Sequence, residues 1–454
     1  MPYSHTTLAT LRGQLAARLD DSANIFWVSA ELDALIAESL RTFGLLAGFW
    51  RERAVLSTVA GTAFYAITAQ TYGSPTLASL VGYTVTDRNL VRDIEYHLLE
   101  PATDGSTYTG TAMFTLNDLR YAIQRRRDQF LADTGCVVTR STQAVASPPS
   151  GRQQLTDTII DVRRAAWQGA SPYDYYTTLW REDERLLTAA GSTWNTTSGT
   201  PEAFSIMAPP PLQLQLAPPP QASGTLELLT VDSGAALDPA TSATVLGIPD
   251  DLTPGVKWGA LCDLLSKDGP ARDLPRAAYC QQRYEEYVAL ARLLPVIIHA
   301  EVQGVSTIPC TLQELESSTP NWENGTSTPS DVAIAAPNMI ALNPVPDGVY
   351  SVTLDVVRKT PVPTTDATQV QIGREQLDAI LDYAEHLALF KVHGAEWNAT
   401  KLQAANFLKQ AVTYNQRLSA SARAVLPASM QSQREKAGRP RRIEAAGIGA
   451  LKGG

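Results

Sequence analysis

The chain has 454 residues, 44% of them hydrophobic, which is enough to bury a sizeable core in roughly two to four compact units. Its formal net charge is −9, and an acidic protein is a poor nucleic-acid binder, because binding of that kind needs Lys and Arg to neutralise phosphates. The N-terminal residues do not resemble a signal peptide, and no apolar run reaches about 18 residues. We therefore expect a soluble, non-secreted protein without membrane spans.

The first predicted elements are two helices followed by β structure. Leucines recur at helical spacing between residues 6 and 19, and the segment DDSAN ends that helix. The segment NIFWVSAELDALIAESLRTF (24–43) predicts a second helix, with Ser29 as a candidate N-cap and Gly44 as a candidate stop. Two β-rich stretches, ERAVLSTV and TAFYAITA, flank a turn at Gly61. Together these patterns predict a helix-plus-β-hairpin unit.

The same order of elements returns further along the chain. The segment TAMFTLNDLRYAIQRRRDQF (111–130) matches the first motif at a constant offset of 87, which places Phe114 at the position of Trp27. A helix over about 116–132, then Gly135 and two more β-rich stretches, complete the second unit. After this unit, YDYYTTLWREDERLLTAAGSTWNTT predicts a short amphipathic helix and a loop. The N-terminal half is therefore predicted to be duplicated.

The C-terminal half contains its own repeat. The segment PLQLQLAPPP (211–220) matches PNMIALNPVP (337–346) at an offset of 126, and an alternating strand follows each copy. Each strand leads into two helices separated by a glycine, Gly269 in the first copy and Gly394 in the second. Repeats this long and this few are more typical of duplicated domains than of a solenoid.

The sequence thus predicts an α+β fold in which duplicated helix-plus-β-hairpin units are followed by duplicated β-plus-helix-pair units and a disordered or extended C-terminal tail. The predicted parts are the N-terminal helices with the first helix/β unit (1–70), a loop-rich insertion (71–108), the second helix/β unit and linker (109–200), the first β/helix-pair unit (201–327), the second such unit (328–418) and the basic tail (419–454).

The tail differs from the body in charge. From Arg423 to the end there are seven basic and two acidic residues, a net charge of +5 that leaves −14 on the rest of the chain. With almost no large apolar residues, this segment cannot offset its own ordering entropy, so we expect it to be disordered until a partner holds it. Its candidate partner-binding residues are Arg434, Lys436, Arg439, Arg441 and Arg442.

Motifs for catalysis are largely missing from the sequence. The chain contains no G-x-x-x-x-G-K-[ST], no G-x-S-x-G and no H-E-x-x-H. The best enzyme candidate is the set Asp382, His386 and His393, which one helix would bring near one face. We interpret this set as structural, because the chain has five histidines and offers no further helix with ligands. We therefore expect no enzyme activity, and no catalytic, cofactor-binding or metal-binding residues.

Three further groups of residues allow more than one interpretation. Arg125–Arg127 can form a partner patch, but consecutive helical positions point in different directions, which favours a solvated face. Tyr279, Tyr284 and Tyr287 recur at helical spacing, which favours core or subunit packing over stacking on nucleic-acid bases. The four cysteines are far apart and lack a C-x-x-C motif, so we expect buried thiols in a reducing compartment.

The repeated N-terminal helix resembles the helical signature of head-to-tail adaptor proteins, also called neck or connector proteins, of tailed bacteriophages. The segments LDYAEHLALFKVHGAEW and AVTYNQRL resemble the terminal helices of the same broad group of phage structural proteins. The chain departs from the short adaptors in its length and in carrying both signatures twice. The positions that match the N-terminal signature are Trp27, Ser29, Glu31, Leu32, Ile36 and Glu38.

This resemblance implies a bacteriophage virion structural protein, assembled in the host cytoplasm and located at the head–tail junction or in the tail. It implies a homo-oligomeric ring, expected to be a dodecamer, that joins the portal protein to tail or nozzle proteins and lets double-stranded DNA pass without specific contacts. Two alternatives remain open. One is a peripheral tail or baseplate protein whose β modules bind host carbohydrate, and the other is a metal hydrolase built on His386 and His393.

Overall fold

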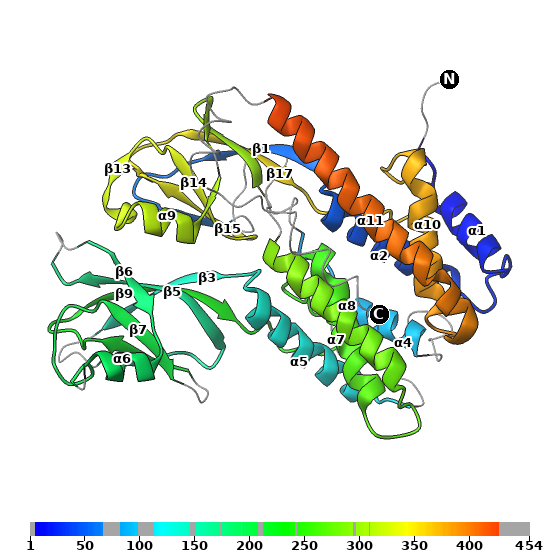
Figure 1. Cartoon of the computed structure of the whole chain (residues 1–454), viewed down its shortest axis with the longest axis horizontal. Helices are drawn as coiled ribbons and strands as arrows, with labels where there is room; N and C mark the ends of the chain where they lie inside the picture. Colours follow the sequence, from blue (N-terminus) through cyan, green and yellow to red (C-terminus); the bar gives the residue numbers. More distant parts are fainter. Residues whose placement is uncertain are drawn as a thin grey trace.

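The computed structural model of the chain describes residues 5–66, 82–98, 113–145, 151–171, 175–191, 193–207, 212–240, 243–293, 297–307 and 309–425. It confirms an α+β fold with duplicated units, and it nests one copy inside the other (Figure 1). We call residues 5–66 with 297–425 the outer copy, and residues 82–293 the inserted copy. None of the helices in the described ranges is long and apolar enough to cross a membrane.

The outer copy is built from both ends of the chain. Its elements are α1 (Leu8–Arg18), α2 (Ser29–Ala47), β1 (Arg51–Ser57), β2 (Phe64–Ala66), β10 (Ile297–Val302), β11 (Val305–Thr307), β12 (Cys310–Thr311), α9 (Leu312–Ser318), the 3-10 turn η2 (Trp322–Asn324), β13 (Thr326–Ser327), β14 (Asp331–Ala336), β15 (Met339–Asn343), β16 (Val345–Pro346), β17 (Ser351–Val357), α10 (Arg374–Leu389) and α11 (Gly394–Val425).

The inserted copy repeats this order within one segment. Its elements are α4 (Asp87–His97), α5 (Leu116–Thr134), β3 (Thr139–Val145), β4 (Arg152–Gln154), β5 (Ile159–Gly169), β6 (Thr177–Arg181), α6 (Glu184–Ala190), β7 (Ala203–Met207), β8 (Gln213–Ala217), β9 (Gly224–Asp232), the 3-10 turn η1 (Asp250–Leu252), α7 (Thr253–Ser266) and α8 (Leu274–Leu293). Each helix pair is interrupted as predicted: Gly269 lies between α7 and α8, and Gly394 is the first residue of α11 after the interruption.

The order of the paired strands is equivalent in the two copies, although the inserted copy joins them in one seven-stranded sheet and the outer copy divides them between separate sheets. The order β1-β17-β10 of the outer copy corresponds to β3-β9-β5 of the inserted copy, and β12-β14-β15-β2 corresponds to β6-β7-β8-β4. Both copies also contain a cis proline after the equivalent strand, at Pro218 and Pro344. The pairing differs from the two expected hairpins, because β1 pairs with β17 and β2 with β15. An isolated two-stranded hairpin is marginal in water, so these strands are stabilised by strands from the other half of the chain.

The helices of both copies share one hydrophobic core. Helix α2 packs against α10 and α11, while α5 packs against α7 and α8 (Figure 1). Trp27 and Phe114, which are equivalent in the sequence repeat, are both buried in this core. The helix ends differ in part from expectation. Val28 occupies the N-cap position of α2, and Gly44 lies inside the helix, where it allows close approach of Trp50 and Thr360.

The stretch 71–108, expected to be rich in loops, contains helix α4. Its first turn is fixed by a capping box between Thr86 and Asn89. Like α1 against α2 in the outer copy, α4 packs against α5. This helix was not evident from the sequence, because a helix this short depends on burying its apolar face, and that burial needs partners distant in sequence. The apolar side chains buried on α4 are Leu90, Val91 and Ile94.

Part of the predicted tail is helical. Helix α11 continues to Val425, so residues 419–425 of the predicted tail are helical. The five basic residues predicted to bind a partner, Arg434, Lys436, Arg439, Arg441 and Arg442, lie outside the described residues.

Candidate functional site

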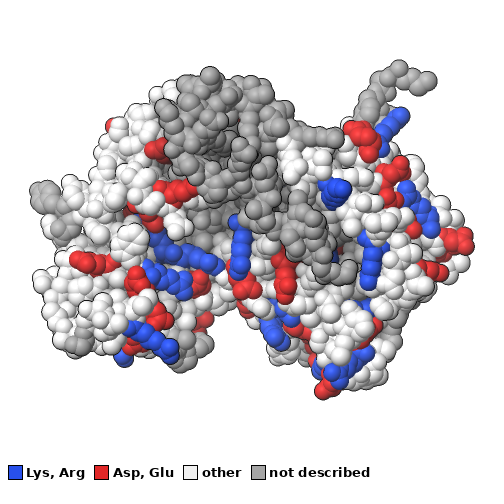
Figure 2. Space-filling view, in the orientation of Figure 1, with Lys and Arg blue, Asp and Glu red and all other residues white. Residues whose placement is uncertain are grey.

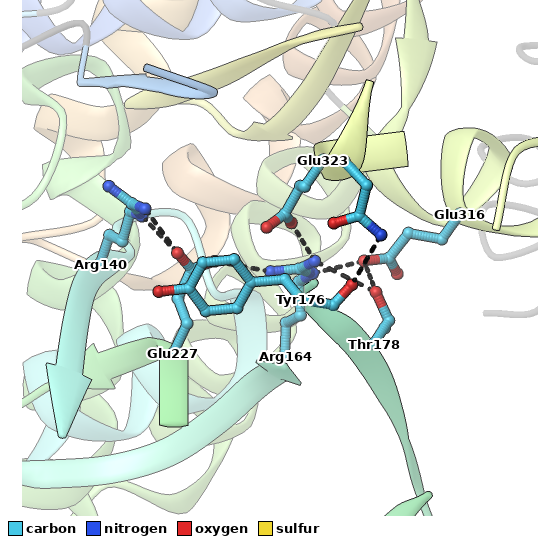
Figure 3. Close-up of polar contacts among 8 residues, drawn as sticks. Arg140, Arg164, Tyr176, Thr178, Glu227, Glu316 and Glu323 are labelled. Carbon is cyan, nitrogen blue, oxygen red and sulfur yellow. Dashed lines mark hydrogen bonds and ion pairs between the residues drawn. The ribbon is translucent and has the colours of Figure 1, made fainter. Parts of the chain in front are cut away.

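The strongest cluster of buried charge lies where the outer copy contacts the sheet of the inserted copy (Figure 3). At its centre is Arg164 on β5, whose side chain is only 4% exposed. Its Nη1 donates to Glu227 of β9 at 2.8 Å. Its other nitrogens donate to Glu316 of α9 and Glu323 of η2, both in the outer copy. One guanidinium therefore joins strands of one copy to a helix and a turn of the other.

A second arginine and an aromatic ring complete this cluster. Arg140 on the neighbouring part of the sheet, β3, donates through Nε to Glu227 Oε2 at 2.9 Å. The ring of Phe64, from β2 of the outer copy, lies under both guanidinium groups, with centroid distances of 5.5 Å to Arg140 and 5.4 Å to Arg164. Trp322 packs edge-on against the same ring at 5.6 Å. We call these residues the Arg164 network, and they combine ion pairs with cation–π contacts across the copies.

The Arg164 network holds three carboxylates against two guanidinium groups, and burial shifts their ionisation. Removal from water raises the pKa of Glu323 to about 7, although Arg164 opposes the shift. Burial would lower the pKa of Arg164, but Glu323, Glu316 and Glu227 outweigh it, so its pKa is raised. Arg164 therefore stays charged while Glu323 titrates near neutral pH. Because the partners come from both copies, this arrangement can hold the copies together, and its strength depends on pH.

The repeated helix motif carries an ion pair that occurs in both copies. Glu31 of α2 binds Nζ of Lys391 at 3.1 Å, and both side chains are buried. The equivalent pair, Asp118 of α5 with Lys267 after α7, has a similar distance of 2.9 Å but is exposed to solvent. Burial raises the pKa of Glu31 to about 7, against the attraction of Lys391. The ion pair thus fixes α2 to α10 and α11 in the outer copy and α5 to α7 and α8 in the inserted copy. It is buried in the outer copy and exposed in the inserted copy.

A further buried polar cluster lies between α2, α4 and α7. Glu38 accepts from Nζ of Lys257 and, at 2.8 Å, from Nε1 of Trp258. Nζ of Lys257 also lies 3.0 Å from Nε2 of His97. Burial lowers the pKa of His97 well below its ordinary value, and Lys257 adds to this effect. A neutral imidazole can accept a hydrogen bond from the lysine, so these groups bind the helices of the two copies to each other.

The candidate metal set Asp382, His386 and His393 is not brought together at one site. Asp382 binds Arg18 of α1 at 2.6 Å. Both ring nitrogens of His386 lie near hydroxyl groups, and burial lowers the pKa of this histidine to about 3. His393 packs against the ring of Trp397, with 5.1 Å between centroids. Within the described residues, no three His, Cys, Asp or Glu side chains are grouped in a way that can hold a metal ion.

The solvated face predicted for Arg125–Arg127 is wrong for two of the three arginines. Arg126 is buried and binds Asp263 of α7 through two nitrogens, at 2.9 and 2.5 Å. Arg127 is buried too, and Nη1 donates to the carbonyl oxygen of Ala235 at 2.7 Å. Because consecutive helical positions point in different directions, the guanidinium groups of Arg126 and Arg127 reach different partners within the chain. Only Arg125 is largely exposed, although it lies 3.7 Å from Asp263.

The remaining sequence predictions concern packing. Tyr284 and Tyr287 are buried in the core and Tyr279 is packed against it, as core packing predicts. All four cysteines are buried, and within the described residues they form no disulfide bond. On the face drawn in Figure 2, Lys and Arg residues are interspersed with Asp and Glu residues. This face therefore presents charges of both signs side by side, unlike the continuous basic surface that binds phosphates.

One hollow lies between the strands of the inserted copy and the η2 turn of the outer copy. Its volume is about 420 Å³. Its lining includes the aromatic side chains of Trp167 and Tyr175 and the amides of Gln221, Asn321 and Asn324. Aromatic faces and neutral amides are groups that suit neutral polar ligands such as sugars.

Sequence reasoning missed the Arg164 network, because its members come from five separate parts of the chain. One signal was available: GSTWNTTSGTP (191–201) and PNWENGTSTP (320–329) share a tryptophan at an offset of 128, Trp194 and Trp322. Comparisons of the chain with models of known protein families and with curated proteins gave no match.

Proposed function

We propose that this chain is a structural protein of a tailed bacteriophage virion, a ring-forming adaptor that joins the portal to the tail and surrounds the DNA channel. The observation that carries the proposal is the role of its buried charges. Arg164 binds carboxylates of both copies and so fixes one copy against the other. These charges pair with one another inside the fold, an arrangement that suits a virion component whose role is to maintain its shape.

The residues of the adaptor-like signature support this proposal. Trp27, Leu32 and Ile36 are buried in the core shared by both copies. The two acidic residues of the signature, Glu31 and Glu38, bind buried lysines of the helix pairs. Each of these side chains thus holds a helix in place, which is the role expected of a motif that recurs in an architectural protein.

The proposed ring also needs surfaces for its neighbours. Among the described strands, β1 and β3 are each paired on one side only, so each leaves an edge that can be covered by another subunit. The net charge of −9 suits a channel through which DNA moves without adhering. In this proposal the basic residues after Val425 bind an acidic surface on the portal, tail or nozzle proteins.

Electron microscopy of the purified chain tests the proposal, both alone and mixed with the portal protein encoded in the same genome. We expect rings, dodecameric if the resemblance holds, that cap the portal. A chain that stays monomeric and never joins portal or tail proteins would contradict the proposal.

The hollow beside η2 favours one second candidate, a peripheral tail or baseplate protein that binds host carbohydrate. Trp167, Tyr175 and Asn324 would supply the stacking and hydrogen-bonding groups. Localisation of the chain by antibody labelling of intact particles separates the candidates. Label at the distal tip of the tail favours carbohydrate binding, and label at the head–tail junction favours the adaptor.

A further inference from the structure

The contact between the two copies has two sides, a docking layer and a receiving face. The docking layer is the segment of the outer copy from α9 to η2, which presents Glu316, Trp322 and Glu323. The receiving face is the side of β3-β9-β5 that carries Arg140 and Arg164 in the inserted copy. Because the chain is duplicated, each copy contains the elements of both sides. Among the described residues, one docking layer and one receiving face contact each other within the chain, and the second layer and face make no such contact.

The remaining docking layer belongs to the inserted copy. Helix α6 corresponds to α9 at an offset of 128, and this offset aligns the N-cap Asp183 with the N-cap Thr311. The same offset aligns Trp194 with Trp322, and Trp194 Nε1 donates to Thr188 of α6 at 3.1 Å. In contrast to α9, no residue of α6 is buried in the described structure, and Leu186 is 60% exposed. This short helix is therefore formed and capped while its outer side faces solvent.

The remaining receiving face belongs to the outer copy, on β1-β17-β10. Arg53 of β1 corresponds to Arg140 at the offset of 87 found for the helices. Arg53 lies opposite Asp355 of β17 and binds it at 2.8 Å, and Asp355 also lies 3.4 Å from His299 of β10. His299 thus takes the place of Arg164 on the third strand. Arg53 is 59% exposed, compared with 37% for Arg140, and His299 is 27% exposed, compared with 4% for Arg164, which is covered by the docking layer.

We propose that α6 and the Trp194 turn of one subunit dock on the β1-β17-β10 face of the next, and so repeat between chains the contact that joins the two copies within one chain. This inference rests on the proposed function and names the subunit surfaces that build the ring. The two surfaces lie apart in the molecule, with α6 at the lower left of the view and β1 and β17 near its upper middle (Figure 1). Contacts between unlike surfaces run head to tail, and they close into a ring when the rotation allows it.

The charges of the two surfaces suit each other. Within the chain, an acidic docking layer with Glu316 and Glu323 meets a receiving face with two arginines. At the offset of 128, Thr188 and Asn195 replace these glutamates in the inserted copy. On the face that they would meet, Arg53, at the position of Arg140, already binds Asp355. Neutral side chains at these two positions, opposite an arginine that is already paired, avoid unpaired charge at this part of the contact. The contact between chains is therefore weaker than the internal one, as a separable assembly requires.

Thiol-specific cross-linking between two chains that each carry one introduced cysteine tests this contact. Thr188→Cys occupies the position of Glu316 and His299→Cys the position of Arg164, a pair in direct contact inside the chain. The four native cysteines are buried and do not compete. Mixing the two variants under assembly conditions, with the portal protein present, should give a covalent dimer on addition of a short bismaleimide, because the backbones of an arginine–glutamate pair lie too far apart for a direct disulfide. Neither variant alone should give it, nor should Thr188→Cys mixed with Leu402→Cys, whose position on α11 is 71% exposed.

The outcomes separate this inference from the proposed function. A dimer that forms only in the first mixture supports the inference, and Trp194→Ala should lower its yield several-fold. Rings that form without this cross-link would overturn the inference and leave the adaptor proposal standing. A chain that forms no oligomer under any of these conditions would overturn both.

Discussion

Replacement of Arg164 by Met is the perturbation that bears most directly on the contact between the two copies. Methionine keeps an unbranched side chain of similar reach and removes the guanidinium that binds Glu227, Glu316 and Glu323. Two of these carboxylates, Glu227 and Glu323, are buried and would lose a cationic partner.

The expected loss of stability is a consequence of this burial. Removal of one partner from a buried ion pair costs about 3–5 kcal/mol, because the remaining charge stays out of water. Against a typical free energy of unfolding of about 5–15 kcal/mol, this is a large fraction. Arg140→Met is the matched control. Arg140 is 37% exposed and shares Glu227 with Arg164, so its loss should cost about 1 kcal/mol or less.

Urea unfolding followed by tryptophan fluorescence and by circular dichroism measures both variants against the wild type. We expect Arg164→Met to lower the midpoint strongly and Arg140→Met to lower it slightly. Equal effects of the two substitutions, or a loss below about 1 kcal/mol for Arg164→Met, would refute the interpretation that the Arg164 network holds the copies together.

Three further predictions concern pH, the repeated ion pair and the tail. Since the folded-state pKa of Glu323 is raised to about 7, its contribution to stability is present near pH 4.5 and is lost as pH rises through 7. Urea titrations should therefore show Glu323→Gln gaining stability relative to wild type between pH 5 and pH 8 (on the order of 1 kcal/mol or more), and parallel pH profiles would contradict this. In thermal unfolding, Lys391→Met should cost about 3 kcal/mol and Lys267→Met less than about 1 kcal/mol, because only the first pair is buried; equal costs would count against burial as the cause. Deletion after Val425 should leave the circular dichroism spectrum and unfolding midpoint unchanged and impair binding to portal or tail, and loss of folding would show that the tail belongs to the body.

Much of the fold could be predicted because its signals are local or repeated. The helix period of 24–43, the glycine breaks at Gly269 and Gly394, and the offset of 126 between the strands all lie within short segments. The nesting of the copies could not be predicted, because it depends on which strands pair. The sequence does not indicate that β1 pairs with β17, almost 300 residues away along the chain.

The site was less accessible from sequence for the same reason. Arg164 of the inserted copy contacts Glu316 and Glu323 only because the outer copy packs against it. The spacing of these three residues in the sequence follows no helical or strand periodicity that would indicate the contact. The solvated face predicted for Arg125–Arg127 was wrong for Arg126 and Arg127. Helical geometry gives the direction of each side chain, but it does not show that a carboxylate or a carbonyl group of another element lies in that direction. The tryptophans at 194 and 322 were the one visible sign of a shared turn.

The stoichiometry of the chain in purified phage particles tests the central claim most directly. Quantitative mass spectrometry against the portal protein of the same particles gives this ratio. The adaptor proposal predicts one copy for each portal subunit, retained in particles whose DNA has been released. Absence of the chain from intact virions would contradict it.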